Sequence, residues 1–174
     1  MANIMPLLAN NFAVYVDDEK QPGIAEGNFP SFEFMTSEIK GAGLAGTINM
    51  PAKGHFASIT ASLTWRTVSP NFAALSEPRG HSFDMYAEHL DWDGGSGQFI
   101  SRRVHVFMKA LTVKSDMGAL TVADSGNAQT EHEIFYFKLD IDGVDQIELD
   151  KINYIFKVQG VDYLAETRRA LGMM

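Results

Sequence analysis

The stretch "EHEIFYFKLDIDGVDQIELD" (residues 131–150) decides the fold class, because apolar and polar side chains alternate along it on both sides of an Asp-Gly pair. Such alternation puts successive side chains on opposite faces of a β-strand. Asp142-Gly143 is a dipeptide favoured in two-residue hairpin turns, where both residues take positive φ. The stretch therefore predicts an antiparallel hairpin with one apolar face and one solvated face. The apolar set of its first strand is Phe135, Phe137, Leu139 and Ile141, opposed by Tyr136, Lys138, Asp140 and Asp142.

Alternation of the same kind runs through residues 57–66 and 103–114. Both segments predict long strands with one wet side. Residues 82–92 fit a strand or a helix by periodicity, and we favour a strand, because the Gly-rich turn "DGGSG" follows and an alternating segment comes after it. The chain as a whole is predicted to be mainly antiparallel β.

Two short helices are expected. Ser69 followed by Pro70 is a typical helix start, so "SPNFAALSE" should form a brief helix. The second helix is "DYLAETRRALG", for which Asp162 is the predicted N-cap. A helix of about ten residues is marginal alone, so Leu164 and Leu171 are expected to pack against the rest of the protein.

Composition narrows the function classes. The chain has 174 residues, a formal net charge of −8 and no cysteine. A chain of this length is most simply one domain. Its negative net charge argues against a surface that binds nucleic acid through clustered lysine and arginine. The lack of cysteine excludes disulfides and thiolate metal sites. No apolar run is long enough for a membrane helix and the N-terminal residues are a poor signal peptide, so we expect a soluble protein made in the cytoplasm.

The spacing of Gly41, Gly43 and Gly46 matches the G-x-G-x-x-G of dinucleotide-binding loops. That loop needs a buried parallel strand before the glycines and a helix directly after them. Here the preceding residues alternate and include charged side chains, and Pro51 follows too soon for a helix. The sequence predicts a long glycine-containing connection between two strands, at about residues 40–56.

No recognisable catalytic or metal site emerges. Carboxylates surround Gly143, but an EF-hand loop needs its glycine at the sixth position and this one would be fourth. The five histidines lack metal-ligand spacing, and no nucleophile-elbow motif occurs. Glu131 and Glu133 are better explained as neighbours on a solvated strand face than as an acid/base pair. We therefore expect no enzyme activity, no metal and no cofactor.

The order of elements resembles that of the major tail tube proteins of contractile bacteriophage tails and of phage-tail-like bacteriocins. The resemblance is most specific in "YFKLDIDG", "IELDKIN" and "VQGVDYLAETRRALG", where strand, Asp-Gly turn, strand, Gly-Val-Asp and terminal helix follow in order. "FPSFEFMTSEIKGAGLAG" gives a second match. The likeness extends over nearly the whole chain from about Phe12.

The resemblance implies an antiparallel β-sandwich-like or barrel-like subunit, a single tail tube domain over residues 1–174, with a short packing helix and a C-terminal helix. Copies would form homohexameric rings, each subunit contributing strands to a ring-wide inner barrel. The rings would stack into a hollow conduit for DNA or for membrane puncture. The particle would be a virion tail or a phage-tail-like bacteriocin assembled in the bacterial cytoplasm.

The resemblance also implies partners: other copies of the chain, the tail sheath protein, the tail terminator, baseplate or spike proteins, and a tape measure protein in the lumen. DNA would pass without specific binding, and the subunit itself would not insert into a membrane.

Two surfaces are expected to serve this assembly. In the family the glycine-containing connection reaches the adjacent ring, which assigns an inter-ring contact to Gly41, Gly43, Leu44, Gly46, Ile48 and Met50. The polar sides of two strands are candidates for the lumen wall, at Ser58, Thr60, Ser62, Thr64, Glu131 and Glu133. Lys138, Arg103 and Lys109 argue against a uniformly acidic wall, and the sequence does not decide which strand faces point inward.

Two other functions stay open. A secretion-system tube protein shares the hexameric ring architecture, although the glycine-containing connection and the C-terminal segment favour the contractile-tail branch. A ligand-binding β-barrel would require an apolar cavity inside one subunit.

Overall fold

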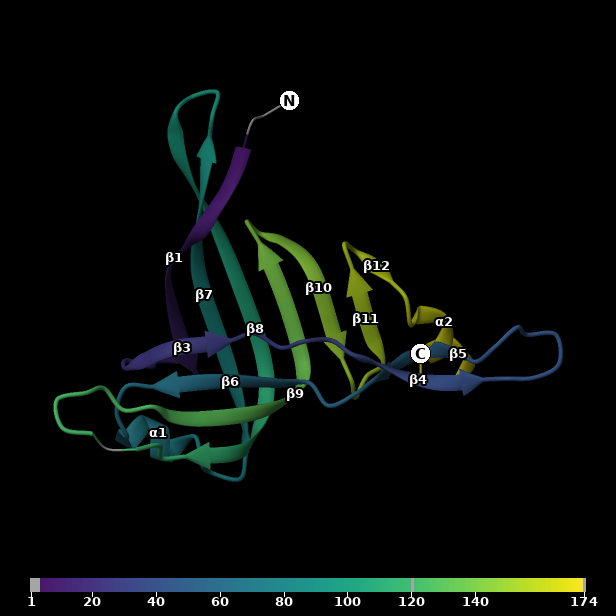
Figure 1. The fold of residues 1–174 in the computed structure, drawn as a ribbon, viewed down its shortest axis with the longest axis horizontal. Helices are drawn as coiled ribbons and strands as arrows, with labels where there is room; N and C mark the ends of the chain where they lie inside the picture. Colours follow the sequence, from purple (N-terminus) through teal and green to yellow (C-terminus); the bar gives the residue numbers. More distant parts are fainter. Residues whose placement is uncertain (1–3, 120, 174) are drawn as a thin grey trace.

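The computed structural model describes residues 4–119 and 121–173 as an antiparallel β-structure with two short helices (Figure 1). This confirms the predicted fold class. The helices are α1 (Pro70–Ala74) and α2 (Ala165–Ala170). The strands are β1 (Ile4–Val16), β2 (Glu19–Lys20), β3 (Ile24–Asn28), β4 (Phe34–Ile39), β5 (Ile48–Phe56), β6 (Thr60–Trp65), β7 (Gly80–Asp93), β8 (Gln98–Asp116), β9 (Ala128–Ile141), β10 (Val144–Asp150), β11 (Ile155–Val158) and β12 (Val161–Asp162).

The strands form two packed layers that share β8 and β9. Layer B has the order β12-β11-β10-β9-β8-β7-β1-β2. Layer A consists of β3, β6, the first half of β9 and the second half of β8, since β6 pairs with β3 on one side and with residues 128–133 on the other. In Figure 1 the strands of layer A run across those of layer B. The two layers are thus one antiparallel sheet folded onto itself.

Irregular pairing between β8 and β9 accompanies the fold of the sheet. The register shifts between Lys109 and Ala110, where Phe135 is the extra residue on β9, and again between Thr112 and Lys114. Such bulges bend a strand and increase its twist, which lets it pass from one layer into the other. The prediction that Phe135 shares the buried face with Phe137 is wrong, because the bulge reverses the alternation: Ile134 and Phe137 are both buried.

The core lies between the two layers and is closed at one end by α1. The alternation predicted for residues 57–66 is confirmed, since Ile59, Ala61, Leu63 and Trp65 are buried. Trp65 meets Phe72 of α1 edge-on, with ring centroids 6.1 Å apart. The hydroxyl of Ser69 accepts a hydrogen bond from the Phe72 N–H, which confirms the predicted helix start.

Two further local predictions are decided by the structure. Residues 82–92 lie in β7 and are strand, not helix. The prediction of Asp162 as the N-cap of the C-terminal helix is wrong: the cap residue is Leu164. Asp162 lies before the helix, in β12, where it pairs with Lys157 of β11. Its carboxylate accepts a hydrogen bond from the Leu164 N–H and forms an ion pair with Arg168, with 2.6 Å between the two atoms.

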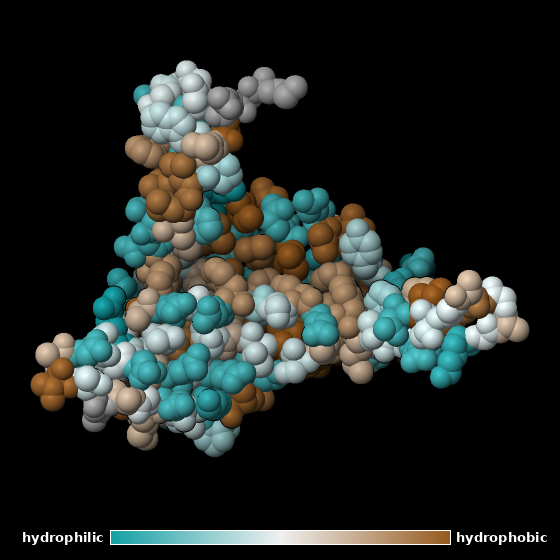
Figure 2. Space-filling model, viewed as in Figure 1, coloured by the Kyte–Doolittle hydropathy of each residue, from teal (hydrophilic) through white to brown (hydrophobic). Residues whose placement is uncertain are grey.

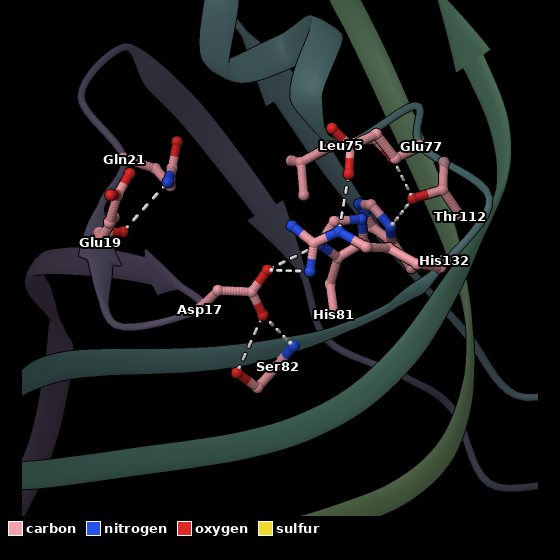
Figure 3. A network of polar contacts seen from close by, with 10 residues as sticks. Asp17, Glu19, Gln21, Leu75, Glu77, His81, Ser82, Thr112 and His132 are labelled. Atoms are coloured by element: carbon pink, nitrogen blue, oxygen red, sulfur yellow. Dashed lines mark hydrogen bonds and ion pairs between the residues drawn. The ribbon is translucent and has the colours of Figure 1, made fainter.

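A buried hydrogen-bonded chain crosses the core, and Figure 3 shows its part at Leu75, Thr112 and His132. Trp65 Nε1 donates to Thr130 Oγ1, which lies 3.0 Å from His132 Nε2. On the other side, Thr112 Oγ1 lies 3.1 Å from His132 Nδ1 and donates to the Leu75 carbonyl. The Thr112 hydroxyl already donates to the Leu75 carbonyl, so His132 must donate to Thr112 from Nδ1. A neutral imidazole then accepts at Nε2 from the Thr130 hydroxyl, which itself accepts from Trp65, and every group in the chain has a partner.

His132 makes the stability of the fold depend on pH. Its side chain is 1% exposed, and burial, with a smaller effect of the His81 charge, lowers its pKa from 6.5 to about 4. The folded state therefore binds fewer protons than the unfolded state between these values. We expect the free energy of unfolding to be constant above pH 6.5 and to fall by roughly 3 kcal/mol towards pH 4.

Urea unfolding at a series of pH values measures this loss. His132→Gln should flatten the slope between pH 6.5 and 4, and His55→Gln, at an exposed histidine, should leave it unchanged. An unchanged slope in His132→Gln would contradict the assignment. Asp17, whose pKa is about 2, contributes its own loss only below this window.

Candidate functional site: a projecting hairpin and a polar sheet face

Strands β4 and β5 form a separate two-stranded sheet that projects from the body (Figure 1). Only residues 40–47 connect the two strands; residues 48–56, which we expected within the connection, form β5. The six residues assigned from the resemblance to an inter-ring contact lie at or near the tip: Gly41, Gly43, Leu44, Gly46, Ile48 and Met50. All six are exposed in the single subunit.

The base of the hairpin is fixed to the body by aromatic packing. Phe34 and Phe56 pair across the two strands with ring centroids 4.8 Å apart, and Phe156 of β11 packs against Phe56 at 5.1 Å. A second contact joins β5 to the segment before α2, where Leu164 lies directly over Gly54. The tip is therefore carried on an anchored base, as a contact element that does not have to fold on binding.

Glycine at the tip has no packing explanation within one subunit. A Cβ added at Gly41, Gly43 or Gly46 would meet no atom within 4 Å, and only Gly43 has a positive φ. The apolar neighbours Leu44 and Ile48 are 42% and 45% exposed. Glycine at such positions allows another chain to approach the backbone closely, because it has no Cβ.

The predicted lumen residues share one face. Thr60 pairs with Glu133, and Ser62 pairs with Glu131, so the polar sides of β6 and β9 lie together on the outside of layer A. Thr64 and Gln129 continue the same face. Ser58, just before β6, hydrogen-bonds Glu133. Hydroxyl and carboxylate groups thus predominate on the side of layer A that faces away from the core, where β8 adds Leu111 opposite Glu133 and Lys114 opposite Glu131.

Glu133 is the most constrained acid on this face. Burial alone would raise its pKa, but hydrogen bonds from Ser58 and Lys151, the Lys151 charge and the Ile59 N–H outweigh burial and lower the pKa below its usual value. Lys151 Nζ lies 2.9 Å from the carboxylate. Sequence reasoning missed Lys151, because it comes from the turn after β10 and no local pattern connects it with β9.

The basic residues that argued against an acidic wall belong to the other layer. Arg103, Lys109 and Lys138 alternate with buried residues on β8 and β9 and point away from the core on layer B. Lys138 pairs with Asp145 at 2.9 Å, and Arg103 with Asp140 at 3.3 Å. They are therefore absent from the face that carries Glu131.

The remaining predicted positions are in a turn and a helix. Asp142 and Gly143 form a two-residue turn between β9 and β10, with φ of 51° and 85°. Leu164 is buried, whereas Leu171 is 57% exposed. Within one subunit, the packing of the α2 region is therefore carried by Leu164, and a packing role for Leu171 stays a prediction.

Among residues 4–119 and 121–173, no group of three His, Cys, Asp or Glu side chains is placed to hold a metal ion. In the same part of the chain, neither helix has the length and apolarity needed to cross a bilayer.

Comparison with known proteins gives the family. The phage tail tube protein FII family matches residues 8–172. The chain belongs to this family. The family is structural and non-enzymatic, which agrees with the lack of a recognisable catalytic motif in the sequence.

Individual relatives of this tail tube family member are distant. The tail tube protein of Escherichia phage P2 is 34% identical over 70 residues, which are 40% of this chain and 41% of that protein. A chain from the PVC sheath/tube terminator of an extracellular contractile injection system superposes with a TM-score of 0.54, at 14% identity over 78% of this chain and 96% of that one. This likeness shows a shared fold. A chain of the anti-feeding prophage baseplate gives a TM-score of 0.45 at 13% identity, over 80% and 97% of the two chains.

The anchoring of the hairpin can be tested at Gly54. Its φ is +80°, and an added Cβ would lie 2.7 Å from Leu164 Cδ2. Gly54→Ala should lower the free energy of unfolding by roughly 2 kcal/mol, from backbone strain and displacement of Leu164. Gly43→Ala is the matched control, because its φ is +93° but its surroundings are open. Thermal and urea unfolding measure the stability of the two variants. An equal loss of unfolding free energy in both would show that the Leu164 contact does not anchor β5.

Proposed function

We propose that the protein is the inner-tube subunit of a contractile phage tail or a related injection particle. Copies form hexameric rings, layer A supplies the strands of a ring-wide inner barrel, and the rings stack into a hollow tube. Family membership supports the tube role. The observation that carries the arrangement is that layer A is apolar towards the core and polar on its other side, as the wall of a water-filled conduit requires.

The direction of the hairpin supports its role between rings. In Figure 1, β4 and β5 extend beyond layer A along the direction of β3 and β6. Strands of a closed barrel are tilted by about 35–45° from its axis, so an element that continues those strands leaves through the end of the barrel. The next ring lies there. Leu44, Ile48 and Met50 supply apolar contact, and the glycines permit close approach of the backbone.

The chemistry of the polar face suits transport without binding. Lysine and arginine contacts to phosphates add affinity and would hold DNA in place. The face of layer A instead presents mainly Ser62, Thr64 and Glu131. Of its lysines, Lys151 is held by Glu133, and Lys114 lies opposite Glu131. A polyanion would pass such a wall without specific contacts.

The proposed partners follow from this role: a sheath protein around the tube, terminator and baseplate or spike proteins at its ends, and a tape measure protein inside it. The structural likeness to a sheath/tube terminator chain supports a place among tail components. The virion tail or a phage-tail-like particle is the proposed location.

The ligand-binding alternative finds less support. A cavity of about 550 Å³ is lined by residues of β1, β7 and β8, including Phe12 and Tyr86, but it is an open groove at the surface and not an enclosed pocket.

Charge placed at the hairpin tip should block stacking. Leu44→Asp combined with Ile48→Asp is expected to leave ring formation and folding intact and to abolish tube growth, because carboxylates would replace apolar contacts between rings. Val161→Asp, at a residue 56% exposed on β12, is the matched control. Electron microscopy measures tube length, and normal tubes from the double variant would refute the inter-ring assignment.

Access of thiol reagents tests which face lines the bore. The chain has no cysteine, so Ser62→Cys and Lys138→Cys each introduce a single thiol. In assembled tubes, Ser62→Cys should react with a small maleimide and be strongly protected from a large polyethylene-glycol maleimide, while Lys138→Cys reacts with both. Reaction of both thiols with the large reagent at similar rates would exclude layer A from the lumen. Disassembled protein, where both thiols should react with both reagents, is the control.

A further inference from the structure

Helix α1 is attached to the rest of the protein at few points. Phe72 in the helix and Leu75 directly after it are buried, whereas residues 66–68 before the helix and 76–80 after it are exposed. Figure 2 shows mainly hydrophilic and intermediate residues where Figure 1 places α1, so the two apolar side chains face inward. A segment with so few buried contacts can open locally while the rest of the domain stays folded.

The hydrogen-bonded chain through His132 begins and ends at contacts of this segment. At one end, Thr112 donates to the Leu75 carbonyl, as Figure 3 shows. At the other end, the ring of Trp65 meets that of Phe72 edge-on. His132 lies between these ends, and both of its ring nitrogens are engaged. The segment is thus fastened through one titratable side chain, and we call the chain of groups the latch: Trp65, Thr130, His132, Thr112 and the Leu75 carbonyl.

Protonation of His132 disrupts the pattern of donors and acceptors in the latch. A protonated imidazole carries a hydrogen on both nitrogens. Its Nε2 can then no longer accept from the Thr130 hydroxyl, which itself accepts from Trp65. The charge would also lie on a side chain that is 1% exposed, where an unpaired charge is costly. The charged form therefore favours a state in which the His132 side chain reaches water.

Few charged groups face His132 from the elements packed against it. His81 of β7 is close enough that its charge lowers the pKa of His132. His81 Nδ1 lies 2.9 Å from the Asp17 carboxylate, which also pairs with Arg79, and Arg79 pairs in turn with Glu77. On β6, β8 and α1, the core-facing side chains are uncharged. Within the part of the chain that the structure describes, protonated His132 therefore gains no ion-pair partner in the closed latch.

The side of α1 next to His81 is incompletely packed. A cavity of about 200 Å³ lies there, lined by residues of α1 and by Asp17 and His81. The His81 side chain is 2% exposed, and its Nε2 has no hydrogen-bond partner among the described residues. A buried polar atom without a partner costs free energy, which is recovered when the atom reaches water. Opening of α1 would therefore hydrate His81 and His132 together.

We propose that residues 66–79, with α1 at their centre, form a pH-gated flap, which neutral His132 holds closed and which opens locally in acid while the two layers stay folded. The open flap exposes Phe72, Leu75 and Trp65. This goes beyond the loss of overall stability expected from His132, because it assigns the first structural change to one segment. It concerns the single subunit and does not depend on assembly.

The two pKa values of His132 set the size of the effect. The pKa is about 4 in the closed protein and 6.5 for an exposed histidine. The closed state binds fewer protons than the open state between these values, so the opening equilibrium rises as the pH falls through this window. By proton linkage, the opening constant should be about twentyfold larger at pH 5 than at pH 7.

Native-state hydrogen exchange of the unassembled protein tests the flap. The reporters are the N–H groups of Ala73, Leu75 and Ser76, which are hydrogen-bonded within the flap. After correction for intrinsic exchange rates, their opening constants should rise about twentyfold from pH 7 to pH 5 and should not respond to low urea, since local opening exposes little surface. The Ile134 N–H, bonded to the Ile59 carbonyl, reports global unfolding and should respond to urea.

Two variants locate the effect in the latch. His132→Gln should remove the pH dependence of the flap amides, because glutamine donates and accepts hydrogen bonds but does not titrate. Thr112→Val removes the donor to the Leu75 carbonyl and should raise the opening constant at pH 7 about tenfold. Ser76→Ala is the matched control: it removes an exposed hydrogen bond to Ser115, also between the flap and β8, and should change the opening constant little.

Two results would overturn the flap. One is exchange of its amides at pH 5 with the urea dependence of the Ile134 amide, because the segment would then open only with the whole domain. The other is a local opening constant that is equal at pH 5 and pH 7, or that rises as much in His132→Gln as in the unmodified protein. Neither result would affect the proposed tube.

Discussion

The passage of β8 and β9 from one layer into the other is the constraint on which the rest of the structure depends. Both strands run without interruption through the two layers, so the layers are parts of a single sheet. Where this sheet bends, the extra residue Phe135 reverses which side chains of β9 point into the core. Without this reversal, Ile134 and Phe137 could not both point into the core. The same bend carries β8 past the start of β7, so that among the residues that the structure describes the last part of β8 pairs on one side only.

The bend also separates two kinds of polar surface. Layer A presents mainly hydroxyls and carboxylates, with Lys151 paired to Glu133 and Lys114 opposite Glu131. Layer B presents the mixed charges of Arg103, Lys109 and Lys138. A tube subunit needs such a division, since one surface must let a polyanion pass and the other must bind proteins. The core between the layers is completed by neutral polar groups, and the hydrogen-bonded chain through His132 shows how closely that core specifies its protonation state.

Much of the fold followed from periodicity, and the failures have physical causes. The segment 57–66 was predicted correctly, because β6 pairs with β9 without a register shift and the one shift in its pairing with β3 lies on the β3 side, between Ile24 and Glu26. The bulge at Phe135 could not be predicted, since it depends on the partner strand. Residues 48–56 were assigned to the glycine-containing connection, because Pro51 excluded a helix there. They form β5 of a two-stranded sheet, in which one edge of each strand needs no backbone donor and a proline is tolerated.

In the proposed tube, layer A lines the bore of a hexameric ring. Electron cryo-microscopy of tubes assembled from the purified protein, at a resolution that traces the strands, measures this arrangement directly. We expect six-fold rings in which Thr60, Ser62 and Glu131 face the bore and layer B faces outwards. Rings with Arg103 and Lys138 lining the bore, or a protein that stays monomeric under every assembly condition, would contradict it.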